Sequence, residues 1–147
     1  MVLRMHHVKD TLRARVRVGY DGRVHKTFRG PRAEERFANE VRILQHLAAA
    51  KCPNVPILIT FDTETLTIET TSCGKRVESL SEEKRAEIFQ DLETEYGVKH
   101  DDPDMRNVTY RISDGRFCVI DFEFAEILPG FGSEPGGLKQ EPDAQSE

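Results

Sequence analysis

Residues 100–123 read HDDPDMRNVTYRISDGRFCVIDFE, and most of what can be inferred about this chain starts from them. Two apolar runs in the second half of this stretch flank the polar residues Ser-Asp-Gly-Arg, which indicates a β-hairpin. If those four residues form the loop, Val108 lies opposite Asp121. Asn107 and Asp121 then lie side by side at the open end of the hairpin.

An amide oxygen and a carboxylate at such a position are hard oxygen ligands, which Mg²⁺ uses beside substrate phosphates. Asp121 closes the apolar strand Phe-Cys-Val-Ile, so it leaves the core at a fixed position. The alternative is an ordinary loop asparagine and a strand-ending aspartate, since both residue types are common in loops. Residues 98–107 are rich in aspartate, which by default indicates a solvated loop. This loop, however, leads directly into Asn107.

Short strand and helix patterns precede this stretch. The expected elements are strands at 12–18 and 23–28, a helix at 31–49, strands at 57–61 and 66–70, a helix at 79–96 and the final hairpin. Alternating apolar and basic residues indicate the first strand. Pro31 opens the first helix, and Ser79 with Glu82 forms a capping box for the second. This order predicts an α+β fold with mostly antiparallel strands.

One carboxylate falls on the apolar face of the first helix. Glu40 lies between the directions of Phe37 and Leu47 at helical spacing. A buried carboxylate is costly unless it is paired, and Lys26, on the preceding strand, is well placed to pair with it. The alternative is that Glu40 lies on a solvated flank of the helix.

The composition limits the classes of function. A net charge of -5 argues against a nucleic-acid binder, which usually has a basic face. No apolar run approaches the roughly 18 residues that a membrane span needs, and the start MVLRMHHVKD lacks the apolar stretch of a signal peptide. We therefore expect a cytoplasmic protein that binds neither nucleic acid nor membrane. Three widely spaced cysteines without a CxxC pair favour free thiols over a zinc site.

Taken together, these residues resemble the protein-kinase superfamily over about residues 8–128. The matching elements are Val24-His-Lys26 for the V-A-I-K strand, Glu40 for its partner glutamate, residues 68–72 for the hinge to the adenine, residues 100–107 for H-x-D-x-x-x-x-N, and Asp121-Phe122-Glu123 for D-F-G. Each motif alone is weak, but five in the expected order are a stronger signal.

The form I-D-F-E and the lack of an H-R-D arginine are more similar to atypical members of the superfamily. These include aminoglycoside and choline kinases, lipopolysaccharide-core kinases and the small kinases of tRNA-modification complexes. The resemblance implies a truncated protein-kinase-like fold. An antiparallel N-lobe sheet with one helix would be followed by a reduced C-lobe made of one long helix, the catalytic loop and a β-hairpin.

The resemblance implies ATP- and Mg²⁺-dependent transfer of the γ-phosphate to a hydroxyl group on a protein, or on the chain itself. Lys26 would hold the α- and β-phosphates and pair with Glu40. Asp102 would accept the proton of the attacking hydroxyl. Asn107 completes this catalytic set, and His100 would brace the loop.

The nucleotide and the metal would have further contacts. The resemblance assigns Mg²⁺ to Asn107 and Asp121. It assigns the adenine to hinge residues Glu69, Thr70 and Thr71. A departure from the family lies upstream, because no glycine-rich loop precedes Leu12. Weak ATP affinity is the expected result.

A second departure is that the later C-lobe helices have no counterpart. We expect a kinase-like domain over residues 1–128 and a disordered tail over 129–147, which is rich in Pro, Gly and acidic residues. Without the later helices, the helix at 79–96 should expose apolar residues, including Phe89 and Leu92. Exposed apolar surface marks a partner site, so a homodimer or a partner protein is expected to complete the lobe.

Two alternatives to an active kinase stay open. One is a catalytically inactive nucleotide-binding pseudokinase or regulatory module that acts through a partner. The other is a small α+β interaction domain without a ligand, in which Glu40 would be exposed and Asp121 would lie apart from Asn107. The acceptor, the oligomeric state and the preference for ATP or GTP do not follow from the sequence.

Overall fold

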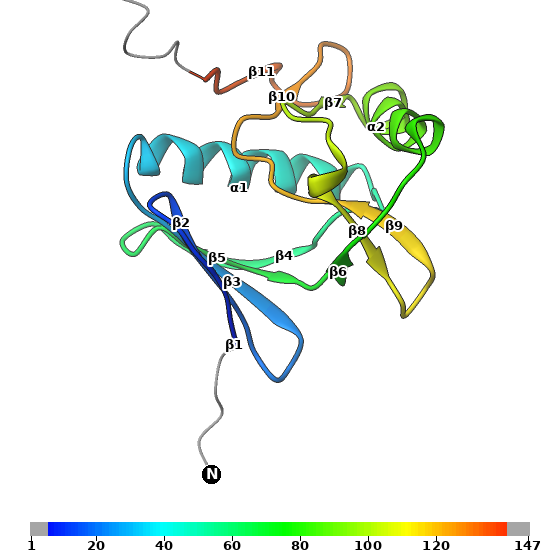
Figure 1. The fold of residues 1–147 in the computed structure, drawn as a ribbon. Coiled ribbons are helices and arrows are strands. Elements are labelled where there is room, and N and C mark those ends of the chain that lie inside the picture. The colour runs from blue at the N-terminus through cyan, green and yellow to red at the C-terminus, as the bar shows by residue number, and fades with distance from the viewer. Residues whose placement is uncertain (1–5, 141–147) are drawn as a thin grey trace, which may run out of the picture.

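The computed structural model describes residues 6–140, and its largest element is a five-stranded antiparallel sheet (Figure 1). The strands, in the order in which they lie side by side, are β1 (His6–Asp10), β2 (Ala14–Val18), β3 (Arg23–Phe28), β5 (Thr67–Thr71) and β4 (Leu58–Asp62). β2 and β3 form the expected hairpin. β1 is a strand that the sequence pattern did not predict, and it pairs with β2.

Helix α1 (Ala33–Ala49) lies across one face of this sheet (Figure 1). Its buried apolar residues include Phe37, Leu44 and Leu47. The ring of Phe37 meets the ring of Phe28 edge-on, with 5.8 Å between centroids. This core fixes α1 against the sheet, and any polar residue on the same face of the helix must find a partner inside.

The second half of the described chain contains helix α2 and two small three-stranded sheets. Their elements are β6 (Lys75–Arg76), α2 (Glu82–Tyr96), β7 (Val98–Lys99), the short 3-10 helix η1 (Met105–Asn107), β8 (Val108–Arg111), β9 (Arg116–Val119), β10 (Glu126–Ile127) and β11 (Gly136–Gly137). One sheet has the order β6-β8-β9 and the other β11-β10-β7. The hairpin β8–β9 starts directly after Asn107 and ends shortly before Asp121.

The register of this hairpin differs from the expected one. Val108 pairs with Val119, not with Asp121, because the tight turn falls at residues 112–115 and Arg111 pairs with Arg116. Asn107 and Asp121 nevertheless stay close along the backbone, since the N–H of Ile120 donates to the carbonyl of Asn107 at 3.0 Å.

Helix α2 begins two residues later than expected and buries its apolar face. Ser81, not Ser79, is the N-cap, and its hydroxyl accepts from the N–H of Lys84 at 3.0 Å. Phe89 and Leu92 are 5% and 3% exposed, so the expectation that they lie on an open surface is wrong. Both belong to the main core, so these two residues give no reason to expect a homodimer or a partner.

The structure also differs from the expected tail, because residues 129–140 pack on the domain (Figure 1). β11 pairs with β10, and the Ser133 hydroxyl lies 2.6 Å from Nδ1 of His46 on α1. Arg42 of α1 donates to the carbonyl of Glu134 at 2.8 Å. Composition did not reveal this packing because most of the bonds use backbone carbonyls of the segment, which any residue supplies. Residues 141–147 lie outside the described part of the chain.

The described residues therefore form a small α+β protein with an antiparallel sheet and two α-helices, as the sequence predicts. Within residues 6–140, neither helix combines the length and the apolar composition that crossing a membrane requires.

Candidate functional site

The ammonium group of Lys26 lies at the centre of a buried charge cluster. On β3, Lys26 and Phe28 point to the inner face of the sheet, toward α1. Nζ of Lys26 donates to Glu40 Oε1 at 2.8 Å, to Asp121 Oδ1 at 3.2 Å and to Glu123 Oε2 at 3.0 Å. The Phe28 ring centroid lies 4.7 Å from the same nitrogen. We call Lys26, Glu40, Asp121 and Glu123 the lysine cluster.

Glu40 is buried on the inner face of α1, as its place in the apolar arc predicts. One carboxylate oxygen binds Lys26, and the other accepts from the backbone N–H of Phe122 at 3.1 Å. Glu40 therefore holds both the lysine and the segment after β9. Its burial also argues against the interaction-domain alternative, which required an exposed Glu40.

Asp121 has the left-handed backbone conformation, with φ at 73°. Such conformations cost a non-glycine residue about 1–2 kcal/mol, although aspartate tolerates them better than most. The turn swings the chain from β9 toward Lys26. With 34% of its side chain exposed, Asp121 is the most accessible carboxylate of the cluster.

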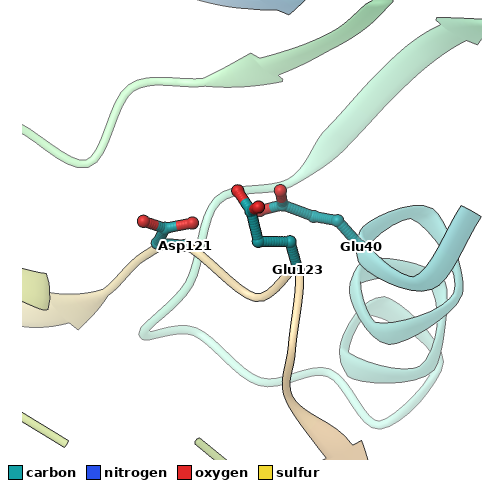
Figure 2. A group of neighbouring side chains, drawn as sticks. All are labelled: Glu40, Asp121 and Glu123. Carbon is teal, nitrogen blue, oxygen red and sulfur yellow. The ribbon is translucent and has the colours of Figure 1, made fainter. Parts of the chain in front are cut away.

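Glu123 is the member of the cluster that the candidate residues from the sequence omit. Its carboxylate bridges two cations, because Oε2 binds Lys26 and Oε1 accepts from Arg36 at 3.0 Å. Figure 2 shows the carboxylates of Glu40 and Glu123 directed toward each other, with Asp121 beside them. Arg36 itself is 1% exposed. Helical spacing could have indicated Arg36, the partner of Glu123, since Arg36 and Glu40 are four residues apart and share a face of α1.

Burial and charge set the protonation of this cluster. Burial opposes the charged form of Lys26, but attraction by Asp121, Glu40 and Glu123 outweighs it and raises the pKa of Lys26 well above its usual value. Burial also raises the pKa of Glu40, and the Lys26 ammonium opposes that shift. With three carboxylates against Lys26 and Arg36, the fully ionised cluster carries a net negative charge.

His100 connects the loop before η1 to the start of the segment that carries Asp121. Its Nδ1 accepts from the N–H of Asp102 at 3.0 Å, so the proton is on Nε2, which lies 3.0 Å from the carbonyl oxygen of Ile120. The ring also packs against Phe89 and Phe122. These contacts fit the bracing role expected for His100.

Asp102 and Asn107, which both belong to the loop at 100–107, contact each other. The Asn107 amide donates to the carbonyl oxygen of Asp102 at 2.9 Å and to its Oδ2 at 3.1 Å. Arg106 donates to both carboxylate oxygens of Asp102, each at 2.9 Å. The amide nitrogen of Asn107 is thus used by Asp102, which leaves the amide oxygen for a metal ion.

The three residues expected at the adenine are not brought together on the inner face of the sheet. On β5, Ile68 pairs with Lys26 and shares its face, so Glu69 points to the opposite face. There Glu69 pairs with Arg23 at 2.9 Å. The Thr71 hydroxyl accepts from the N–H of Ile57 at 2.9 Å. Of the three side chains, only that of Thr70 lies on the face of Lys26, and it is buried.

The donor set of the lysine cluster fits a hard cation. Carboxylate oxygens of Glu40, Asp121 and Glu123 all lie within 4.8 Å of one another. Carboxylate oxygens are ligands that Mg²⁺ accepts, and Asp121 offers the most accessible of them. The ammonium of Lys26 gives its three N–H groups to these carboxylates, so it can bind a phosphate oxygen only in exchange for one of them.

Compared with the models of known protein families and with curated proteins, the chain matches none. The chemistry of the site therefore rests on the geometry described above.

Proposed function

We propose that this chain binds Mg·ATP and transfers the γ-phosphate to a hydroxyl group of a protein, as a minimal kinase-like phosphotransferase. The observation that carries the proposal is the buried Lys26–Glu40 ion pair at 2.8 Å, which also contacts Asp121. A structural ion pair alone would need no accessible third carboxylate in a left-handed turn. A lysine that holds phosphates, by contrast, needs a metal-binding carboxylate beside it.

The order of elements supports the same proposal. An antiparallel sheet with one helix is followed by a long helix, an aspartate-rich loop and a hairpin. His100 links that loop to Ile120, the residue before Asp121. Asp102 and Asp121 are therefore positioned relative to each other by a short path of contacts, as a transfer site requires.

In the proposed mechanism Lys26 exchanges Asp121, the most exposed of its three carboxylate partners, for a phosphate oxygen, and Glu40 keeps the lysine in place. The second oxygen of Glu40 is fixed by the N–H of Phe122, so Glu40 has little freedom to move away. Asp121 and the amide oxygen of Asn107 would hold Mg²⁺. Bound there, Mg²⁺ would neutralise charge on the phosphates.

Asp102 is the proposed general base. The hydroxyl oxygen of the acceptor attacks the γ-phosphorus, the bond to the β-phosphate oxygen breaks, ADP leaves, and the hydroxyl proton goes to Asp102. Arg106 competes with the hydroxyl for this carboxylate, because it donates to both of its oxygens. The side chain of Arg106 is 62% exposed, so it is free to turn outward toward a substrate phosphate.

A second candidate function is nucleotide binding without transfer. The observation in its favour is the same Asp102–Arg106 pair, in which both carboxylate oxygens are already engaged. If Arg106 keeps both bonds when nucleotide binds, its guanidinium competes with the acceptor hydroxyl for the oxygens of Asp102. The chain would then act as a nucleotide-dependent regulatory module.

Thermal unfolding with and without Mg·ATP tests the nucleotide site. A ligand at 100 times its Kd adds about 2.7 kcal/mol to the free energy of unfolding. We expect a Mg-dependent rise in Tm for the wild type and none for Asp121→Ala. A wild-type Tm unchanged by millimolar nucleotide would refute the proposal for this chain.

Transfer of labelled γ-phosphate separates the two candidates. Active transfer predicts labelling of the chain or of a generic protein acceptor, with a loss of about 10²-fold or more in Asp102→Asn. Nucleotide-induced stabilisation without any labelled product would favour the regulatory module. Full transfer by Asp102→Asn would contradict the assigned base.

A further inference from the structure

A hollow of about 230 Å³ lies between α2 and the β8–β9 hairpin. Apolar side chains from both elements line it: Ile88, Leu92, Phe117 and Val119. None of its lining residues belongs to the lysine cluster or to the loop at 100–107. The hollow is therefore a feature separate from the proposed nucleotide site.

The rim of the hollow is acidic. Glu87, Asp91 and Glu95 follow one another at intervals of four residues along α2, and all three line the hollow and are exposed. Like charges at this spacing destabilise a helix by about 0.2–0.5 kcal/mol per pair. These three carboxylates therefore destabilise α2, so helix stability does not explain their presence.

Only one end of this rim is neutralised within residues 6–140. Lys84 pairs with Glu87 at 3.3 Å and lies over the Phe117 ring, 5.6 Å from its centroid. Asp91 and Glu95 have no ion pair with any described residue. The arginines of the neighbouring hairpin make their ion pairs with another residue, because Arg111 and Arg116 both pair with Asp114.

Two further exposed apolar side chains belong to the β8–β9 hairpin and its turn. Tyr110 is 41% exposed, and its ring lies 5.3 Å from that of Phe117. Ile112, at the start of the hairpin turn, is 87% exposed. An apolar strip beside an acidic rim differs from an ordinary solvated surface, where apolar residues are scattered singly.

We propose that this hollow docks an extended peptide segment of a partner protein in which basic side chains lie next to aliphatic ones. The aliphatic side chains would cover Ile88 and Phe117, which are partly exposed, and the basic side chains would pair with Asp91 and Glu95. Charge complementarity selects this occupant, because an acidic segment would meet two unpaired carboxylates. A purely polar segment would leave the apolar floor uncovered.

Fluorescence anisotropy with defined peptides tests the docking site. The probe is a labelled peptide with two arginines followed by two leucines in a Gly-Ser background. Its controls replace the arginines with glutamates or the leucines with serines. We expect the basic–aliphatic peptide to bind at least about tenfold more tightly than either control, with affinity that falls as salt is added.

Matched charge reversals on α2 locate the binding. Asp91→Lys should weaken the basic–aliphatic peptide about tenfold, whereas Glu83→Lys, an exposed change outside the hollow, should leave its Kd unchanged. Asp91→Asn, with a smaller loss, guards against an effect of Asp91→Lys on folding, which Tm reports. Equal binding of all three peptides, or unchanged binding by Asp91→Lys, overturns the proposal. A wild-type dimer that Asp91→Lys dissociates would also overturn it, because a second copy would be the occupant.

Discussion

The guanidinium group of Arg36 donates to Glu123 Oε1 at 3.0 Å and so joins α1 to the segment that follows β9. The same guanidinium donates to the carbonyl oxygens of Pro31 at 2.8 Å and Arg29 at 2.6 Å, which lie before the helix. Arg36 therefore fixes Glu123 from one side while Lys26 binds it from the other. The orientation of Lys26 depends in part on a residue that does not touch it.

Breaking the Arg36–Glu123 pair should be costly. Removal of one partner of a buried ion pair costs about 3–5 kcal/mol, and here Lys26 still pairs with Glu123, so the loss should lie at the lower end of that range. We expect Arg36→Met to lower the free energy of unfolding by this amount in urea denaturation. Glu123→Gln in the same background should cost less than it does alone. Additive losses in that double-mutant cycle would mean that the two residues do not interact.

The contribution of Lys26 to stability should disappear at alkaline pH. Burial lowers the pKa of Lys26, but Asp121, Glu40 and Glu123 raise it well above its usual 10.5 in the folded state. A group with a raised folded pKa stabilises fully below its unfolded pKa and less as pH rises toward the folded value. The difference in the free energy of unfolding between wild type and Lys26→Met should therefore narrow above pH 10.5.

A matched variant controls for other alkaline effects. Lys51 is an exposed lysine after α1, so Lys51→Met removes one ammonium group without touching the cluster. Its stability curve should run parallel to that of the wild type across the same pH range. If the two lysine variants behaved alike, the pH effect would not come from the lysine cluster.

The sequence predicted part of the site because single positions carried the signal. Glu40 on an apolar arc required a cation, and Lys26, on the preceding strand, was well placed to supply it. The face on which Glu69 lies could not be predicted, because the face of a strand residue depends on register, and a shift of one residue moves a side chain to the other face. The predicted register of the β8–β9 hairpin was wrong for a similar reason, because the position of its turn cannot be inferred from Ser-Asp-Gly-Arg alone.

The start of α2 gives a direct test of a corrected boundary. Ser81 accepts from the N–H of Lys84, whereas Ser79 lies outside the helix. Loss of an N-cap costs about 1 kcal/mol. Ser81→Ala should therefore lower the free energy of unfolding by about that amount, and Ser79→Ala should change it little. The reverse order would restore the cap that the sequence pattern suggested.

The left-handed backbone at Asp121 should lower the stability of the fold when the residue there is not glycine. Glycine adopts positive φ freely, so Asp121→Gly should be more stable than Asp121→Ala by about 1 kcal/mol. Both variants lose the carboxylate, and the comparison isolates the backbone term at φ 73°. Equal stabilities in urea denaturation would show that this turn relaxes once the carboxylate is gone.

Gly97 and Phe131 test whether residues 129–140 pack as described. Gly97 ends α2 with φ at 71°, and a Cβ there would overlap the Phe131 ring. Gly97→Ala should lose more than the about 1–2 kcal/mol expected from backbone strain alone. In a Phe131→Ala background the steric part disappears, so the cost of Gly97→Ala should fall to the backbone part. Strict additivity would mean that Phe131 does not rest on α2, and the segment would then be the loose tail that its composition suggests.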